Sequence, residues 1–468
     1  MLRSTLTTTL RLKQNIKSTT IPKILSLLPS SSSKSYSTSN IQLNKVETTT
    51  NNSSTSSSTT NTGISTPSYG IYPGDKRINY VSNINVYTYN KDDLLPCFRI
   101  MDEEGNIRND AKDPNIDRDT LVKAYTYMVR VSIMDMVLYD CQRQGRISFY
   151  MTSGGEEATH IGSAMALQQT DEIFAQYREQ GVLLWRGFTL QNICDQCFGN
   201  VDDVGKGRQM PVHYGSKAQN FQTISSPLAT QIPQAAGAAY LCKLEKKGRA
   251  VICYFGEGAA SEGDFHAGFN MSTTQKVPLI FFCRNNGFAI STPVENQYGG
   301  DGIAARGRGY GMHTIRVDGN DIFAVYEATK LARSIALGED GTGKTKPVLI
   351  EAMTYREGHH STSDDSTRYR KPEEIQLWRT RSNPIKRLRA YLERKGWWDA
   401  EQEKALLQEE RKAILTAVSA AEHKPRPSTH SLFEDVYKEI PKHIAEQQKE
   451  LEEHMNAYPT SYPSGHGH

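Results

Sequence analysis

Several features are absent from this 468-residue sequence. It contains no run of about 18 apolar residues, which excludes a membrane-spanning helix. It also contains no long basic run, so nucleic-acid binding is not favoured. Cysteine is scarce, and the seven cysteines are scattered along the chain rather than arranged as a disulfide framework. The lack of a disulfide framework makes a reducing compartment the simpler interpretation.

Acidic residues are absent from positions 1–46, which contain seven lysines and arginines. A basic, Ser/Thr-rich and acid-poor N-terminus is typical of an organellar transit peptide, and no continuous apolar segment follows Arg3 as a secretory signal would require. We therefore expect residues 1–46 to direct the chain to the mitochondrial matrix, the alternative being a merely disordered tail. Residues 48–62 are fifteen consecutive Ser, Thr or Asn, so 47–74 are expected to be disordered. Removing residues 1–74, with seven basic side chains and one acidic, would change the net charge from +3 to −3.

Residues 75–383 have the composition of a globular domain. A helix capped by Asp119 is predicted to run to about Cys141. Short apolar runs at 250–255, 279–283 and 348–352 predict strands, and the patterns at 262–274 and 321–337 predict helices between them. This alternation predicts an α/β fold, a parallel sheet flanked by helices. From 384 to 468 the pattern is helical and charged, with helices expected over 387–395, 400–422 and 441–455 and a loop after them.

Two motifs resemble known sites but lack the context that those sites need. Residues 338–345 match the phosphate-loop pattern GxxxxGK[ST], yet here a helix precedes the motif and a strand follows it, which is the reverse of the working arrangement. We expect a solvated loop there. Cys194 and Cys197 form a CxxC pair with no second ligand pair nearby. We expect two buried side chains in the middle of a helix.

Two other loops carry the strongest chemical signal. The strand at 250–255 leads into Gly-Glu-Gly at 256–258, and the strand at 279–283 leads into Arg-Asn-Asn-Gly at 284–287. The 26 residues between Gly258 and Asn285 suit one helical crossover, which would place both loops at the sheet edge where open α/β sheets bind ligands. The glycines allow the backbone to approach a diphosphate, and Arg284 can pair with a phosphate. The carboxylate of Glu257 and the amide oxygen of Asn286 suit Mg²⁺.

An acidic Gly-x-Gly motif followed by about two dozen residues and Asn-Asn resembles the thiamine-diphosphate motif of transketolase-like enzymes. Four further segments narrow the resemblance: Gln-Tyr-Arg-Glu at 176–179, Gly-Lys-Gly-Arg-Gln-Met-Pro at 205–211, Ser-Ser-Pro-Leu-Ala-Thr-Gln at 225–231, and Gly-His-His-Ser-Thr-Ser-Asp-Asp at 358–365. From about residue 96 onward the chain resembles the alpha subunits of the decarboxylating components of mitochondrial branched-chain 2-oxo acid dehydrogenases.

The resemblance implies a thiamine-diphosphate-binding fold and the cofactors thiamine diphosphate, Mg²⁺ and K⁺. It implies oxidative decarboxylation of the branched-chain 2-oxo acids derived from leucine, isoleucine and valine, with transfer of the acyl group to a lipoyl group on a partner acyltransferase. It further implies an α₂β₂ heterotetramer, in which a beta subunit supplies the glutamate that activates the cofactor. A regulatory kinase and phosphatase are the other implied partners.

The resemblance also implies roles for individual positions. The cofactor would be held by Tyr177, Arg178, Ser226, Leu228, Gly258, Ala259, Arg284 and His360. Mg²⁺ would be bound by Glu257, Asn286 and the backbone carbonyl of Phe288. K⁺ would order the loop containing Ser225, Pro227, Thr230 and Gln231. The branched substrate side chain would contact Phe149 and Leu228. His360 would be the catalytic histidine, and Ser361 the phosphorylated serine.

Two positions depart from the pattern. Phe288 stands where relatives usually have tyrosine, and Lys371 stands where some relatives have a second regulatory serine, so no phosphorylation is expected at Lys371. Two alternative functions stay open on the sequence alone. One is the alpha subunit of a pyruvate or acetoin dehydrogenase, and the other is a non-catalytic scaffold subunit that keeps the fold without binding the cofactor.

Overall fold

The structure, a computed structural model, describes residues 69–73, 76–84, 86 and 93–462. The chain divides into two units, residues 1–85 and 86–468. The predicted transit peptide and most of 47–74 lie outside the described residues. In the first unit, strands β1 (Tyr69–Tyr72) and β2 (Lys76–Asn79) pair antiparallel. Strand β1 lies within the segment expected to be disordered, so that expectation is wrong for residues 69–72.

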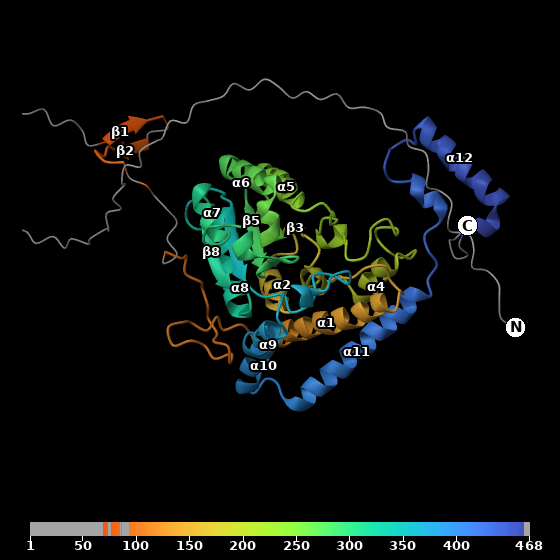
Figure 1. The fold of residues 1–468 in the computed structure, drawn as a ribbon, viewed down its shortest axis with the longest axis horizontal. Coiled ribbons are helices and arrows are strands. Elements are labelled where there is room, and N and C mark those ends of the chain that lie inside the picture. The colour runs from red at the N-terminus through yellow and green to blue at the C-terminus, as the bar shows by residue number, and fades with distance from the viewer. Residues whose placement is uncertain (1–68, 74–75, 85, 87–92, 463–468) are drawn as a thin grey trace, which may run out of the picture. The chain divides into compact units, whose positions relative to one another are not determined.

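A five-stranded parallel sheet forms the centre of the second unit (Figure 1). Its strands are β3 (Glu172–Phe174), β4 (Val251–Gly256), β5 (Leu279–Asn285), β8 (His313–Asp318) and β9 (Val348–Met353), arranged in the order β3-β4-β5-β9-β8. Every residue of β5 is buried. The three strands predicted from apolar runs are confirmed as β4, β5 and β9, the strands buried between the two edges.

Helices cover both faces of the sheet, as predicted. Helices α5 (Gln231–Glu245) and α6 (Gly263–Gln275) lie on one face, where Phe281 of β5 stacks on Phe269 of α6 with ring centroids 4.1 Å apart. The other face packs against α1 (Arg118–Arg143), α2 (Glu157–Met165) and α8 (Ile322–Leu337). Successive residues of β5 therefore enter different cores, as the alternation of side chains along a strand requires.

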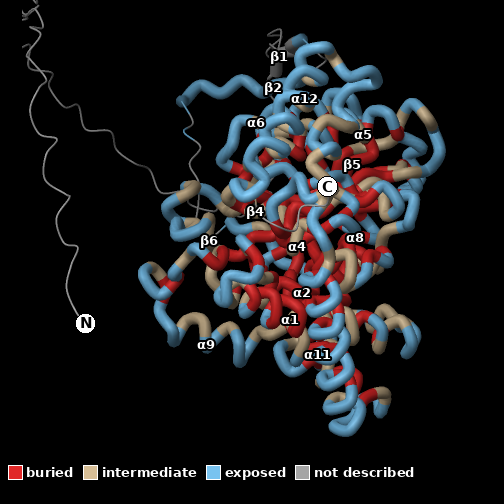
Figure 2. Tube along the Cα trace, turned by 90° about the vertical axis from the view of Figure 1, so that its right-hand side faces the viewer, coloured by how far each residue is buried: buried red, intermediate tan, exposed pale blue. Residues whose placement is uncertain are grey.

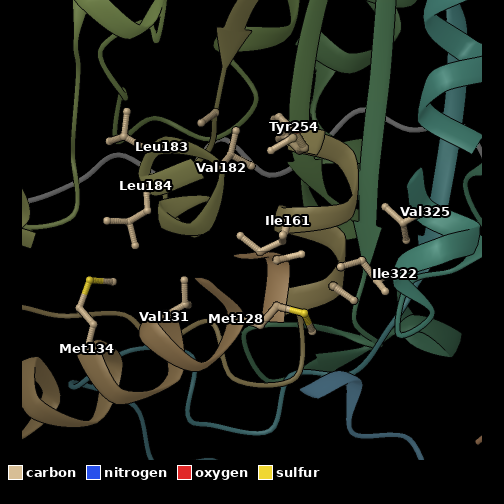
Figure 3. Packing of buried hydrophobic residues seen from close by; sticks show 14 of the residues in the cluster. Met128, Val131, Met134, Ile161, Val182, Leu183, Leu184, Tyr254, Ile322 and Val325 are labelled. Atoms are coloured by element: carbon tan, nitrogen blue, oxygen red, sulfur yellow. The ribbon is translucent and has the colours of Figure 1, made fainter. Parts of the chain in front are cut away.

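The larger core fills the space between the sheet and α1, α2 and α8. Figure 3 shows Met128 of α1 and Ile161 of α2 meeting in this core, with Tyr254 of β4 and Ile322 and Val325 of α8 around them. Figure 2 shows the buried positions concentrated along the same elements, with exposed residues outside. This packing holds the central strands and their following loops in place.

Shorter elements join these layers: α3 (Gln180–Trp185), α4 (Leu190–Phe198), β6 (Phe288–Ala289), β7 (Thr292–Pro293), α7 (Ala304–Gly309) and α9 (Pro372–Arg381). The C-terminal region contains α10 (Pro384–Arg394), α11 (Ala400–Glu422) and α12 (Lys442–Ala457), which confirms its three predicted helices. Helix α11 packs along α1 and α4, and Glu410 of α11 accepts two hydrogen bonds of 2.8 Å from Arg130 of α1. The boundary between 75–383 and 384–468 stays a prediction.

One predicted boundary differs from the structure, and three elements were not predicted. Helix α1 begins two residues earlier than expected, because Asp117 rather than Asp119 accepts the Thr120 N–H at 2.9 Å. Strands β3 and β8 and helix α9 lack the apolar patterns that would predict them. In β8, for example, Arg316 points into the interior and pairs with Glu351 at 2.9 Å, which breaks the apolar run.

The structure confirms both predictions about the phosphate-loop-like motif and the CxxC pair. Residues 338–345 connect the end of α8 to β9, the reverse of a phosphate loop. Cys194 and Cys197 are buried, unpaired cysteines inside α4. Among the residues that the structure describes, no helix is long and apolar enough to cross a membrane.

Candidate active site

Four neighbouring strands send their following loops to one edge of the sheet. Strand β3 is followed by Tyr177 and Arg178, β4 by residues 257–259, β5 by 286–288, and β9 by 354–365. Because β4 pairs with β5 and β5 with β9 in parallel register, Gly256 lies beside Arg284. The loops therefore meet at the carboxyl edge, as predicted, and line a cavity of about 320 Å³.

Most of the predicted site residues line this cavity: Tyr177, Arg178, Leu228, Glu257, Gly258, Ala259, Arg284, Asn286, Phe288 and His360. Others are not among its lining residues: Phe149, Ser225, Ser226, Pro227, Thr230, Gln231 and Ser361. Phe149 packs instead beside the larger core. A larger cavity of about 1000 Å³, bordered by Cys97 and Trp378, contains none of the predicted residues.

The predicted magnesium ligands lie together. The Asn286 N–H donates to Glu257 Oε2 at 3.3 Å, while Glu257 Oε1 is buried without a hydrogen-bond partner. Burial raises the pKa of Glu257 to about 7, since the ionised form has lost its water. A carboxylate oxygen without a partner in a polar cavity fits a hard cation, which would restore the charged form. The third predicted ligand, the Phe288 carbonyl, faces Arg356 Nη1 at 3.4 Å.

Gly258 is required by close approach rather than by an unusual dihedral angle. A Cβ atom on this residue would lie 2.7 Å from the Cβ of Ala289 in β6, closer than two carbon atoms approach. The turn after β4 can therefore contact β6 only if residue 258 has no side chain. The contact places the turn against the predicted magnesium ligands.

Arg284 is enclosed by two carboxylates that the sequence did not reveal. Its guanidinium pairs with Glu156 and with Glu179, and all three side chains are buried. Burial opposes the charge, but the two carboxylates raise the pKa of Arg284 above its usual value. Any anion that Arg284 contacts in the cavity must therefore share it with Glu156 and Glu179. Nothing in the local sequence signals these partners, because each comes from a different loop or helix end.

Two other arginines face the cavity, and neither pairs with a carboxylate of the residues that the structure describes. Arg178 donates to the backbone carbonyls of Thr152 and His360, each at 2.6 Å. Arg356 donates to the carbonyl of Ile290 at 2.8 Å, and burial lowers its pKa to about 10, with Arg178 adding to the effect. Arg356 was not identified from the sequence, although it precedes His360 by only four residues. Two buried cations in one cavity favour an anionic ligand.

His360 lines the same cavity as Arg178 and Arg356. Its Nε2 is 3.5 Å from the Tyr177 hydroxyl, and its backbone N–H donates to Asp364 at 2.8 Å. Burial lowers the pKa of His360 to about 3, with Arg178 and Arg356 contributing. The imidazole is therefore neutral at physiological pH, with one ring nitrogen that donates a hydrogen bond and one that accepts.

The loop at 225–231 lies beside the cavity. Its Leu228 lines the cavity wall, while the Ser226 hydroxyl is 2.7 Å from His213 Nε2. Thr230 donates to the Pro227 carbonyl at 3.1 Å, which closes the turn before α5. In the loop that follows β9, Ser361 is 8% exposed, and its hydroxyl accepts the Ser363 N–H at 3.2 Å.

Comparison with known proteins assigns the family. Residues 125–430 match the model of the dehydrogenase E1 component. The chain belongs to the dehydrogenase E1 family. It is 58% identical to the human 2-oxoisovalerate dehydrogenase subunit alpha, mitochondrial, over 347 residues, which cover 74% of this chain and 77% of that one. The Caenorhabditis elegans protein of the same name is 54% identical over 371 residues, covering 79% and 85%, and the Dictyostelium discoideum protein 56% over 364, covering 78% and 81%. Membership of this E1 family implies thiamine diphosphate as the cofactor.

Proposed function

We propose that this chain is the alpha subunit of a mitochondrial branched-chain 2-oxo acid dehydrogenase, 3-methyl-2-oxobutanoate dehydrogenase (2-methylpropanoyl-transferring), working in the matrix. It would catalyse oxidative decarboxylation and transfer of the acyl group to a lipoyl group. The observation that carries the proposal is the cavity at the carboxyl edge, which combines two unpaired arginines, an orphaned carboxylate oxygen and a neutral histidine. The similarity to relatives named 2-oxoisovalerate dehydrogenase subunit alpha supports the substrate class.

In this proposal Tyr177, Arg178, Arg284 and the turn at Gly258 and Ala259 would hold the diphosphate end of the cofactor. Ser226, Leu228 and His360 contact the rest of the cofactor. Glu257, Asn286 and the Phe288 carbonyl would hold Mg²⁺; the carbonyl oxygen has a second lone pair beside the one that faces Arg356. When bound, thiamine diphosphate supplies the nucleophilic carbon and the electron sink for decarboxylation.

K⁺ would order the loop that precedes α5, through Ser225, Pro227, Thr230 and Gln231. Gln231 is buried and donates to the Tyr254 carbonyl at 3.1 Å, which ties the end of this loop to β4. A cation at this loop would stabilise the position of Leu228 against the substrate side chain. Phe149, which lies outside the cavity lining, would contact that side chain only after a local shift.

His360 would carry the proton that acyl transfer to lipoyl sulfur requires. A neutral imidazole held 3.5 Å from Tyr177 has one nitrogen free for the substrate while its backbone is fixed by Arg178 and Asp364. Because this proton transfer is proposed at the imidazole ring itself, replacement of the ring removes the step without removing the cofactor site.

The partners in this proposal are a beta subunit in an α₂β₂ assembly, a lipoyl-bearing acyltransferase, and a kinase and phosphatase acting on Ser361. A phosphate on Ser361 would place a dianion next to His360 and disrupt the loop around it. Since Ser361 is nearly buried, a kinase would have to capture the loop in an open state.

The test is a substrate comparison with the chain co-expressed with its beta subunit. We expect Mg²⁺-dependent binding of thiamine diphosphate by calorimetry, and faster turnover of 2-oxoisovalerate than of pyruvate. Faster turnover of pyruvate or acetoin would assign the chain to those dehydrogenases instead. Absence of metal-dependent cofactor binding would leave a non-catalytic scaffold and overturn the proposal.

A further inference from the structure

The orientation of one side-chain amide decides whether the predicted magnesium site can form. Asn286 has an oxygen, which binds Mg²⁺, and a nitrogen, which does not. The two ends of an amide have nearly the same shape, so sterics alone do not select between them. Selection requires a neighbour that accepts hydrogen bonds but cannot donate them.

Glu156 is such a neighbour. Its Oε1 accepts a hydrogen bond of 2.8 Å from Asn286 Nδ2, and its Oε2 pairs with Arg284. The nitrogen end of the amide is thereby held at Glu156, and Asn286 Oδ1 is left on the other side, where it accepts the Phe288 N–H at 3.3 Å. Phe288 is itself the third predicted metal-binding residue.

The side chain of Glu156 is not used by the helix that it begins. It occupies the N-cap of α2, yet its side chain makes no capping hydrogen bond. A buried carboxylate is costly unless it is paired and hydrogen-bonded, and Glu156 is 0% exposed. Its two oxygens are used by the two residues that border the predicted metal and diphosphate sites.

We propose that Glu156 is a positioning residue for metal binding, which orients the Asn286 amide and the Arg284 guanidinium together. This inference rests on the proposed function, since it concerns the metal of that same site. Glu156 does not touch the metal. It determines which end of Asn286 faces the metal.

The decisive variant is Glu156→Gln, which keeps the shape of the side chain. Both groups facing Glu156 are donors, and glutamine offers them only one acceptor oxygen. The charged Arg284 takes that oxygen, so the new amide nitrogen faces Asn286. Asn286 must then turn its oxygen toward residue 156 and its nitrogen toward the metal. We expect the metal affinity to fall at least about tenfold.

A compensating variant makes the test specific. Asn286→Asp alone places two carboxylates against each other and should also weaken metal binding. In the double variant Glu156→Gln with Asn286→Asp, the glutamine nitrogen donates to one aspartate oxygen and the other oxygen remains for the metal. We expect the double variant to bind metal more tightly than either single variant.

The measurement is the dissociation constant of Mn²⁺, a spectroscopic substitute for Mg²⁺, read from the free-ion electron paramagnetic resonance signal with thiamine diphosphate present and the beta subunit co-expressed. Glu410→Gln is the matched control, because it removes the charge of a buried glutamate that pairs with a partly buried arginine outside the site. Its metal affinity should equal that of the wild type.

The outcomes separate the two proposals. If the wild type shows no cofactor-dependent Mn²⁺ binding, the proposed function fails. If the wild type binds the metal and Glu156→Gln binds it equally well, or the double variant is no better than Asn286→Asp, the positioning role is overturned. Should Glu156→Gln fail to assemble, the comparison of Asn286→Asp with the double variant still decides.

Discussion

At the scale of single residues, His360 is the clearest test of the chemistry. Replacing His360 with alanine removes the proposed proton carrier but leaves the arginines and metal ligands in place. We expect thiamine diphosphate affinity to change less than about threefold, while acylation of a lipoyl substrate falls by at least about a hundredfold, the usual scale for a general acid or base. Both are measured on the complex with the beta subunit. The control variant is His313→Ala, because His313 is exposed and is the first residue of β8, at the end of the strand away from the carboxyl edge. Unchanged acylation in His360→Ala would refute the role.

A second histidine, His160 in α2, leads us to predict how the stability of the protein depends on pH. Both of its ring nitrogens are buried without hydrogen-bond partners. Burial lowers the pKa of His160 to about 3, with Arg284 and Arg178 adding to the effect and Glu156 opposing it. Between that value and about 6.5 only the unfolded chain binds the proton, so acidification lowers the free energy of unfolding by up to about 1.4 kcal/mol per pH unit. This loss is absent above pH 6.5.

The variants His160→Leu and His160→Gln do not titrate in this range. We therefore expect both to show a shallower fall of the thermal midpoint between pH 6.5 and pH 4 than the wild type, whatever their stability at pH 7.5. The measurement is differential scanning calorimetry of the complex across that range. A slope identical to that of the wild type in both variants would mean that His160 is already protonated in the folded protein.

At the scale of elements, the sequence predicted what apolar patterns encode and missed what long-range pairing creates. Strands β4, β5 and β9 are continuous apolar runs, and the crossover length between Gly258 and Asn285 predicted that the loops after β4 and β5 lie at the same edge of the sheet. Strand β8 was not predicted, because Arg316 interrupts its apolar run and is buried only through its ion pair with Glu351 on the neighbouring strand. The site divides in the same way: motif residues were identified, whereas Glu156 and Glu179 depend on the folded arrangement around Arg284.

Asp321, predicted as the start of the helix at 321–337, does more than cap it. Its Oδ1 accepts the Phe323 and Ala324 N–H groups of α8, while its Oδ2 accepts the N–H groups of Ile100 and Met101 at 2.7 and 2.6 Å. Asp321→Ala would leave buried donors without acceptors, and we expect a loss of about 2–4 kcal/mol in the free energy of unfolding.

The control for Asp321 is an exposed cap of the same chemistry. Asp399 accepts two N–H groups at the start of α11 but lies at the surface. Asp399→Ala should cost about 1 kcal/mol, because water replaces the lost acceptor. Chemical denaturation of both variants measures the difference. Equal losses would show that the contacts to Ile100 and Met101 add nothing to the cap.

At the scale of the whole molecule, the helices after residue 383 differ in how far they belong to the core. Helices α10 and α11 contribute buried side chains to the larger core, among them Leu388, Leu392, Ile414 and Val418. Helix α12 has no buried residue. A chain ending at 383 exposes the surface of α1 that α11 covers and leaves Arg130 without Glu410. Burial of this extent is worth roughly 1.5–3 kcal/mol for each large apolar side chain, so the four together contribute an amount comparable to the whole stability of a typical domain.

We therefore expect a chain ending at 383 to be insoluble or unfolded, and a chain ending at 440, which lacks only α12 and the residues after it, to keep the fold. Circular dichroism and thermal melting of the two truncated chains, each co-expressed with the beta subunit, make the comparison. A cooperative melt near that of the full chain from the protein ending at 383 would establish 384–468 as a separable region. Loss of folding in the chain ending at 440 would instead mean that α12 stabilises the core through contacts that bury no side chain.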